Sequence, residues 1–266
     1  MAEKLVSTNT NMITDPLFLQ LLVGIITGLG AGYLGSFMIL KRMSLVGDVI
    51  SHVALPGIAL AFIFKINPFL GAFAALFLAV IGIWLLERKT ELPSETLVGI
   101  FFALSLALGI LITPEPELLE ALFGDITKIG PFDALITIAL TTTMFFTMFR
   151  IYRGLTLSIV SKELAQSIGI NVSKVNLLFL LLVAIIVALG LKVVGVFLMG
   201  ALVIVPAAAA KNISISLASF TRLAALFGGF SALGGILFAS HFNLHSGPIV
   251  VLTSGIIFLL TLLFKK

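Results

Sequence analysis

Apolar segments long enough to cross a lipid bilayer follow one another along almost the whole chain. Of its 266 residues, 60% are hydrophobic and only 11% are charged, whereas charged residues alone make up about 25% of an ordinary soluble domain. A bilayer core about 30 Å thick needs roughly 20 predominantly apolar residues per helix. The sequence therefore predicts an all-α fold, a polytopic transmembrane helical bundle, with no room for a soluble enzyme domain on the same chain.

The hydropathy pattern divides into about eight or nine spans behind a short polar segment. Residues 1–16 are polar and lack the regions of a signal peptide, so residues 17–266 are expected to form a single transmembrane domain. Glycines at four-residue spacing in the first span, beginning at Gly24, favour close packing against another helix. Lys192 alone separates the sixth span from the seventh, which predicts a tight hairpin or a partly broken pair. The expected spans are 17–40, 47–64, 69–86, 95–112, 132–149, 175–191, 193–210, 217–239 and 248–264.

The distribution of basic residues predicts the orientation in the membrane. If the spans alternate and the C-terminus is cytoplasmic, only four of the 16 basic residues fall outside, and this asymmetry is the positive-inside pattern. The N-terminus is then outside. The basic residues expected on the cytoplasmic side are Lys41, Arg42, Arg88, Lys89, Arg150, Arg153, Lys162, Lys174, Lys211, Arg222, Lys265 and Lys266.

The outer side is predicted to carry an acidic surface. Residues 113–120 include Glu115, Glu117 and Glu120 and are too acidic for the bilayer. Such a surface attracts cations or a basic partner. Residues 118–123 are expected to form a short surface helix.

Asp48 and His52 are ionisable residues within an otherwise apolar segment. They are four residues apart, so on a helix they share one face. Ionisable groups at membrane depth suggest a functional site, and with no cysteine in the chain the strong metal ligands are His, Asp and Glu. Aspartate with histidine suits zinc, manganese or iron. A structural pair, with Asp48 capping the helix and His52 hydrogen-bonded in the bundle, stays open.

His241 and His245 are also four residues apart, but they lie in a predicted loop. A solvated loop or a secondary metal-attracting role at the outer mouth would both fit.

Motifs of several enzyme classes are absent from the sequence. No Gly-Lys dipeptide, His-Glu-x-x-His or Gly-x-Ser-x-Gly motif occurs, which excludes a Walker A phosphate loop, a zinc protease helix and a serine hydrolase elbow.

The longest polar interruption runs from residue 150 to residue 174. It predicts a short helix over about residues 162–167, ended by Gly169. The segment would serve as a plain connector, or as a helix that lies across a partner protein through its small residues Ala165, Ser167 and Gly169.

Several of these segments together resemble a known family. The sequence of residues 42–57, which includes Gly-Asp-Val-Ile-Ser-His and then Leu-Pro-Gly, is the most specific. With residues 162–171, 191–195, 202–209 and 246–250, it resembles the membrane permease subunits of bacterial ABC importers for zinc, manganese or iron. The resemblance covers nearly the entire chain.

The resemblance implies a function and a set of partners. It implies a homodimer in the bacterial cytoplasmic (inner) membrane, with two copies of a separate ATP-binding subunit and an extracytoplasmic metal-binding protein. The chain itself would be a transport subunit and not an enzyme. Zinc or manganese would be its cargo, with no permanently bound cofactor. Its partners would include membrane lipid but not nucleic acid, since in a membrane protein the net charge of +4 reports orientation.

The resemblance also implies roles for particular residues. Asp48 and His52 would contact the metal, whereas it assigns nothing to His241 and His245. The cytoplasmic segment 150–174 would hold a coupling helix that docks on the ATPase, and the acidic outer surface would receive the metal-binding protein. The coupling residues would be Lys162, Glu163, Ala165, Ser167 and Gly169, and the docking residues Glu115, Glu117 and Glu120. The alternatives are a secondary transporter driven by an ion gradient, and a membrane scaffold or intramembrane enzyme with an Asp–His metal site.

Overall fold

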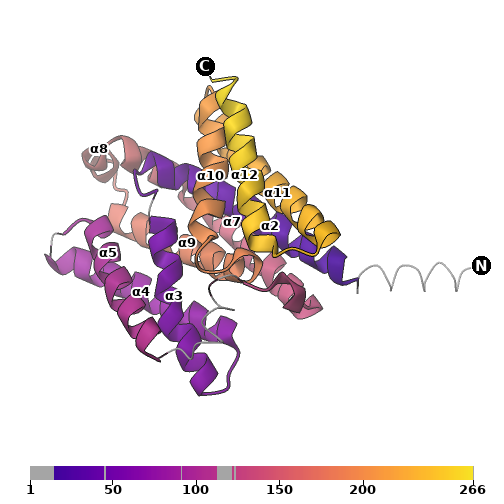
Figure 1. The fold of residues 1–266 in the computed structure, drawn as a ribbon. Helices are drawn as coiled ribbons and strands as arrows, with labels where there is room; N and C mark the ends of the chain where they lie inside the picture. Colours follow the sequence, from indigo (N-terminus) through magenta and orange to yellow (C-terminus); the bar gives the residue numbers. More distant parts are fainter. Residues whose placement is uncertain (1–14, 45, 91, 113–121, 123, 266) are drawn as a thin grey trace, which may run out of the picture.

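The computed structural model describes residues 15–44, 46–90, 92–112, 122 and 124–265, which contain helices and no strand (Figure 1). Nine of these helices are apolar, and they confirm the predicted helical bundle. Two further elements are short, the 3-10 helix η1 (Ile126–Lys128) and α8 (Lys162–Ser167). The apolar helices are α2 (Pro16–Leu40), α3 (Val46–Ile63), α4 (Pro68–Thr90), α5 (Ser94–Ile112), α7 (Pro131–Val160), α9 (Val172–Val194), α10 (Met199–Ile213), α11 (Leu217–Phe242) and α12 (Ser246–Leu262).

Seven of the apolar helices are long and apolar enough to cross a membrane, while α10 and α12 are shorter. Most boundaries lie close to the predicted ones. The main difference in length is α7, which continues for eleven residues beyond the predicted end at residue 149. Residues 150–160, predicted to begin a polar loop, are therefore helical. Two prolines lie inside apolar helices, Pro56 in α3 and Pro206 in α10. Both helices continue on either side of the proline.

The connection between α9 and α10 differs from the predicted hairpin around Lys192. That lysine belongs to the last turn of α9, where its ammonium group pairs with the carboxylate of Asp133. The helix ends at Gly195, whose φ of +78° places it in the left-handed region. A turn over residues 195–198 follows, and α10 begins at Met199 instead of near residue 193.

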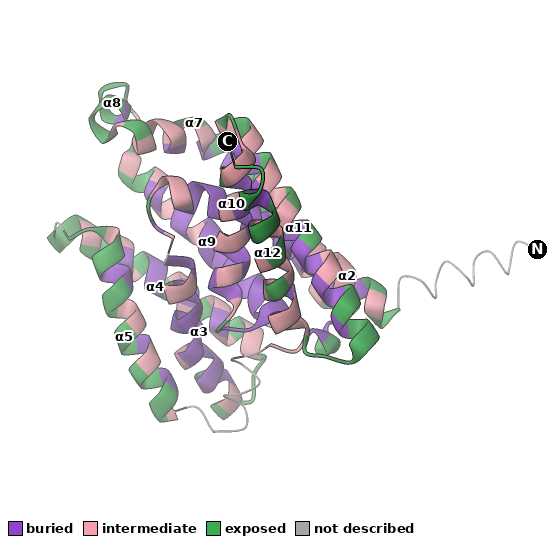
Figure 2. Ribbon diagram, turned by 45° about the horizontal axis from the view of Figure 1, so that its top comes forward, coloured by how far each residue is buried: buried purple, intermediate pink, exposed green. Residues whose placement is uncertain are grey.

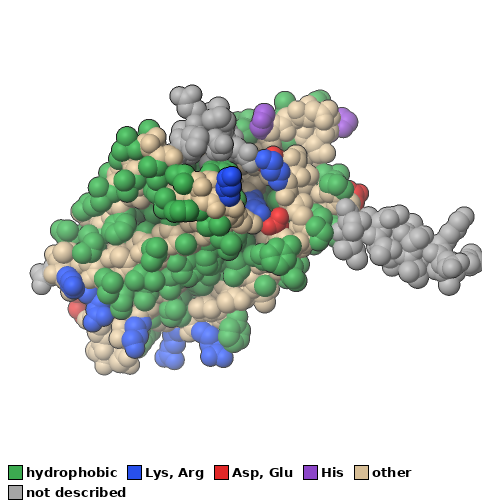
Figure 3. All heavy atoms as spheres, turned by 90° about the horizontal axis from the view of Figure 1, so that it is seen from below, with side chains coloured by type: hydrophobic (Ala, Val, Ile, Leu, Met, Phe, Trp, Pro, Cys, Tyr) green, Lys and Arg blue, Asp and Glu red, His purple; other side chains and the backbone are tan. Residues whose placement is uncertain are grey.

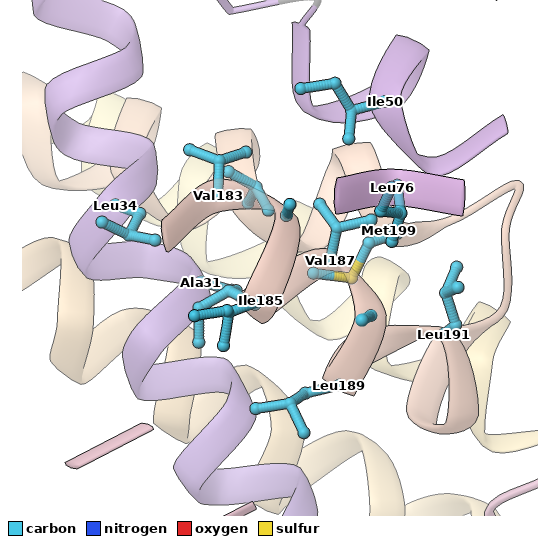
Figure 4. Packing of buried hydrophobic residues seen from close by; sticks show 14 of the residues in the cluster. Ala31, Leu34, Ile50, Leu76, Val183, Ile185, Val187, Leu189, Leu191 and Met199 are labelled. Carbon is cyan, nitrogen blue, oxygen red and sulfur yellow. The ribbon is translucent and has the colours of Figure 1, made fainter. Parts of the chain in front are cut away.

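Helix α9 lies at the centre of the bundle. In its most apolar 18-residue stretch 78% of the residues are buried, against 22% for α5, which is therefore peripheral (Figure 2). Branched side chains of α9 point to several neighbours at once (Figure 4). Val183 and Ile185 lie toward α2 residues such as Leu34, and Val187 lies near Met199 of α10.

The glycine spacing in α2 is explained by close packing against α11. A Cβ atom at Gly28 would lie 2.4 Å from the carbonyl oxygen of Gly228, and one at Gly228 would lie 2.1 Å from the carbonyl oxygen of Gly28. The two backbones therefore approach through small residues, as the sequence predicted. This packing fixes the C-terminal helices against the start of the chain.

The outer surface of the bundle is broadly apolar. Large hydrophobic side chains are exposed on most spans, including Leu111 on α5, Phe149 on α7 and Leu259 on α12. Figure 3 shows hydrophobic side chains covering the middle of one face, with lysine and arginine along its lower left edge and a second group in its upper middle. Apolar surface of this extent is expected where lipid or another membrane chain is the neighbour.

Candidate functional site

Helix α3 carries both ionisable residues of the candidate site. Asp48 lies in its first turn, where a carboxylate is favoured by the unpaired N–H groups and the dipole of the helix. His52 lies one turn further along and is 8% exposed, while Asp48 is partly exposed. The sequence prediction that the two residues share one helix is confirmed.

A backbone contact selects the tautomer of the neutral His52 ring. Its Nδ1 atom lies 2.9 Å from the carbonyl oxygen of Asp48. A carbonyl oxygen can only accept a hydrogen bond, so Nδ1 carries the proton and the lone pair is on Nε2. Metal-binding histidines are commonly held in this way, with one ring nitrogen donating and the other free for the ion.

Ser51 joins the site to the turn between α9 and α10. Its hydroxyl oxygen lies 2.6 Å from the carbonyl oxygen of Asp48 and 2.8 Å from that of Val196, and it can donate to either. The side chain is fully buried. Val196 lies just beyond Gly195, the C-cap of α9, so Ser51 connects the start of α3 to the turn that follows α9.

Two aromatic rings enclose His52. The Phe102 ring of α5 meets it edge-on with centroids 5.2 Å apart, and the Phe197 ring from the turn after α9 lies at 5.8 Å. Apolar walls exclude water, which strengthens the interaction of an ion with the ligands that remain. Neither phenylalanine was identified from the sequence, because both come from other elements.

Gly200 allows α10 to approach the acid. A Cβ atom at this position would lie 2.4 Å from the Cβ of Asp48 and 2.8 Å from its Oδ1. The first turn of α10 therefore rests directly against Asp48. Only a glycine fits there without displacing the carboxylate.

One chain supplies two candidate metal ligands at this site, Asp48 and His52. Across the described part of the chain, no three residues among His, Cys, Asp and Glu are grouped so as to hold a metal ion. A closed structural zinc site uses four ligands. The arrangement is therefore half of a site that could coordinate a transition metal.

The other two histidines are not brought to this pair. His241 lies in the last turn of α11, and His245 is the N-cap of α12 after the left-handed residue Asn243. Both are exposed, and the 241 ring contacts Phe242 edge-on at 4.9 Å. The helix thus extends to residue 242, so the predicted loop is shorter than expected and the two histidines do not share one helix.

The short helix predicted over residues 162–167 is present as α8 (Lys162–Ser167). Ser161 caps it by accepting from the Leu164 N–H at 3.1 Å, and Gly169, with a φ of +83°, lies just beyond its end. A hydrogen bond from its own backbone N–H, and a second from the Ser161 hydroxyl, lower the pKa of the exposed Glu163 carboxyl. Figure 1 shows this helix at the end of α7, apart from the main bundle.

The exposed face of α8 differs from the predicted one. Ala165 is fully buried, because the helix rests on its own bundle through this residue, so it cannot contact a partner here. Leu164 and Ile168, four residues apart, are instead exposed at 50% and 55%. Their apolar character at a polar end of the molecule could have marked them in the sequence.

The predicted docking residues Glu115, Glu117 and Glu120 lie outside the described residues.

An apolar helical bundle that carries an aspartate and a histidine one turn apart, with a short polar helix beside it, is typical of a membrane transport protein. The chain belongs to the ABC 3 transport family, whose pattern it matches over residues 14–265. It is thus a multi-pass membrane permease of the bacterial ABC transporter class.

Curated relatives and a solved structure agree with this assignment. The chain is 34% identical over 253 residues to "Manganese transport system membrane protein MntC" of Listeria monocytogenes, covering 93% of this chain and 90% of that protein. It is 33% identical over 261 residues to "High-affinity zinc uptake system membrane protein ZnuB" of Haemophilus influenzae, covering 94% and 97%. The structure described as PsaBC from Streptococcus pneumoniae in complex with Fab superposes with a TM-score of 0.82 at 30% identity, covering 98% of this chain and 95% of that one.

Proposed function

We propose that this chain is the transmembrane permease subunit of an ATP-driven importer of divalent transition-metal ions, zinc or manganese, and that it forms the translocation path as a homodimer. The observation that carries the proposal is the His52 ring, whose Nδ1 is engaged by the Asp48 carbonyl oxygen, which leaves the ring lone pair on Nε2. A carboxylate lies one turn away on the same buried helix. The relatives named for manganese transport and zinc uptake support the choice of cargo.

The incomplete ligand set favours two copies of the chain around one ion. Asp48 and His52 from each copy would supply four ligands, the number that zinc prefers. The same pair suits manganese and ferrous iron. The metal is the cargo, so the site must release it, and ligands shared between two chains separate when the chains move apart.

Energy is expected to come from separate chains. The sequence carries no phosphate-binding loop with a Gly-Lys dipeptide, so ATP hydrolysis belongs to two partner subunits. Leu164 of α8 and Ile168, the residue directly after the helix, are exposed and offer a contact for them. An extracytoplasmic metal-binding protein would deliver the ion to the opposite side.

Protons compete with the metal at this site. Imidazole and carboxylate bind a metal ion only when deprotonated. Acidification therefore weakens binding, and uptake is expected to fall as the medium is made acidic. A variant without the His52 imidazole should lose only the part of this pH dependence that comes from the imidazole, since the carboxylate still binds protons.

The test is ATP-dependent metal uptake in proteoliposomes that hold the chain with its ATP-binding and metal-binding partners. Asp48→Asn and His52→Gln are each expected to lower zinc or manganese uptake at least about tenfold, since the loss of a single ligand or its support costs about 10–100-fold in metal affinity. The matched control is His241→Gln with His245→Gln, which should leave uptake unchanged. Each variant is checked for membrane insertion and assembly.

Two results would contradict the proposal. Normal uptake by both site variants would make the pair structural. Uptake that needs no ATP-binding chain and follows an ion gradient would instead support a secondary transporter.

A further inference from the structure

A second polar site lies at the end of the bundle where α9 begins. It is a cavity of about 680 Å³ between the ends of α2, α4 and α7, the beginnings of α5 and α9, and α8. This volume falls in the roughly 300–1,000 Å³ range of small-molecule sites. All these helix ends were predicted to be cytoplasmic, so the cavity lies at the depth of the lipid headgroups on that side.

The charges that line the cavity are mainly basic. Four basic and two acidic side chains line it, which gives a net charge of +2: Lys41, Arg42, Arg88, Lys162, Glu87 and Glu95. Four positive charges drawn from three separate helix ends around one cavity attract an anion.

Lys41 and Glu87 are already committed to a network inside the protein. The Lys41 ammonium group donates to the side-chain oxygen of Asn176, and the amide nitrogen of Asn176 donates to Glu87 at 3.2 Å and to Ser94 at 3.3 Å. Burial lowers the pKa of Lys41 to about 8, although Glu87 and Glu95 oppose that shift. The network stabilises one wall of the cavity, and Lys41 remains charged at neutral pH.

The remaining cations are available to a ligand. Within the described residues, Arg42, Arg88 and Lys162 are exposed and none has a carboxylate oxygen within 4.0 Å. Arg42 also has a φ of +60°, a left-handed conformation in which a glycine or asparagine would be less strained. An arginine at that position favours a use for its side chain.

The surroundings of the cavity are those of a lipid and not of a free anion. Apolar side chains, among them Leu40, Met43 and Ile159, line it beside the cations. The Trp84 indole donates to the Ser173 hydroxyl at 2.9 Å and lies under the Arg88 guanidinium, 5.0 Å from its ring centre. Ser173 and Arg88 both line the cavity, and tryptophan is typical of the membrane interface.

We propose that this cavity binds the headgroup of an anionic phospholipid from the cytoplasmic leaflet. Arg42 and Lys162 would contact the phosphate, with Arg88 beside them, while the acyl chains would lie along the exposed apolar side chains of the neighbouring helices. Basic pockets between membrane helices on the cytoplasmic side bind anionic lipids in this manner. The proposal does not depend on the identity of the transported ion.

Trp84 provides the measurement, because it is the single tryptophan of the chain. The full chain is reconstituted in phosphatidylcholine vesicles that contain a small fraction of either phosphatidylglycerol or phosphatidylcholine with brominated acyl chains, which quench tryptophan on contact. Quenching by brominated phosphatidylglycerol is expected to exceed that by brominated phosphatidylcholine at least about threefold. Equal quenching by the two lipids would overturn the proposal.

Paired variants separate a built site from general attraction to a basic surface. Arg42→Gln with Lys162→Gln should remove the preference while leaving the stack of Arg88 on Trp84 in place. Lys211→Gln with Arg222→Gln removes the same charge from the same side of the protein, outside the cavity, and should keep the preference. A preference that survives the first pair, or falls equally in both, would overturn the proposal.

Two further experiments show whether something other than a lipid occupies the cavity. Millimolar inorganic phosphate should leave the preference unchanged, and its loss would mean that the cavity binds a soluble anion. Native mass spectrometry of the chain with its ATP-binding partner should still show bound phosphatidylglycerol in the wild type and less in the first pair. Lipid that is lost when the partner binds would mean that the partner protein occupies the cavity.

Discussion

At the scale of single residues, the position of the Asp48 carboxylate depends on a neighbour that has no side chain. The first turn of α10 lies against Asp48 at Gly200, and a Cβ atom there would lie within 2.8 Å of three atoms of the acid. Ordinary Cβ contacts are longer than 3.4 Å, so either α10 or the acid must move when a side chain is added. Gly200 is therefore as important for the proposed ion path as a direct ligand.

Gly200→Ala tests this dependence. Overpacking of this kind costs roughly 1–3 kcal/mol, and the acid is expected to shift, so metal uptake should fall at least about tenfold while the chain still inserts and assembles. Gly99→Ala is the matched control, because a Cβ there meets nothing within 4 Å. Unchanged uptake by Gly200→Ala, measured in the same proteoliposomes, would show that the acid is not held by this contact.

Lys41 predicts a dependence of stability on pH. Its pKa is lowered to about 8, first by burial, from an ordinary value of 10.5. Below pH 8 the lysine is charged in both the folded and unfolded states, and the folded state bears the full cost of burying the charge. Between about pH 8 and 10.5 the unfolded state binds more protons, so the free energy of unfolding rises with pH in this window.

The prediction is tested by comparing the thermal unfolding temperature of the wild type with that of Lys41→Met. In detergent, the thermal unfolding temperature of the wild type relative to that of Lys41→Met should rise from pH 7.5 to pH 9.5. Taking the difference cancels the other titrating lysines, which the two chains share. Parallel pH profiles would contradict the lowered pKa.

At the scale of elements, apolar length predicted nearly all the spans, while the ends set by tertiary packing were harder to find. Arg150 and Arg153 marked the expected end of the fifth span, yet α7 continues to Val160. Its inner face stays buried through Ile151 and Leu155, one helical turn apart, while both arginines are exposed. A helix that leaves the bilayer but keeps one packed face cannot be delimited by hydropathy alone.

The sequence predicted the two ionisable residues of the candidate site but not the residues that surround them. The spacing of Asp48 and His52 along one helix was visible, because α3 supplies both residues. Ser51, Phe102 and Gly200 were not identified, because their roles depend on how α5, α10 and the turn at Val196 come together around α3. Sequence periodicity describes one helix and contains nothing about such contacts.

Helix α8 allows coupling to be tested apart from metal binding. If its exposed apolar residues contact the ATP-binding partner, Leu164→Asp with Ile168→Asp should abolish ATP-dependent uptake, because two charges would then face an apolar contact. Metal binding by the detergent-solubilised chain should be unchanged. Ile215→Asp, at an 80% exposed position in the turn between α10 and α11, is the control. Uptake retained in the α8 variant would exclude this face from the contact.

At the scale of the whole molecule, the two ligands on each chain set the expected stoichiometry. If one ion is shared by two copies, the purified dimer binds one metal per two chains, and equilibrium dialysis with zinc should give about half an ion per chain. A chain that completed the site by itself would bind one ion per chain. Replacing His52 in one half of a covalently linked pair should weaken binding, because one ligand in four is lost.

The absence of cysteine makes the geometry of such a dimer directly measurable. Asp48→Cys introduces the only thiol, and ligands that meet at one ion lie within a few ångströms of each other across the two-fold axis. A short bifunctional thiol reagent should therefore join two copies in membranes, and zinc should slow the reaction because the thiolate at position 48 is itself a zinc ligand. His241→Cys, exposed at the end of α11, is the control that should stay monomeric. If the two variants cross-link equally, or Asp48→Cys does not cross-link although the dimer is intact, the Asp48–His52 pairs do not meet at the subunit interface, and each chain would have to carry its ion alone.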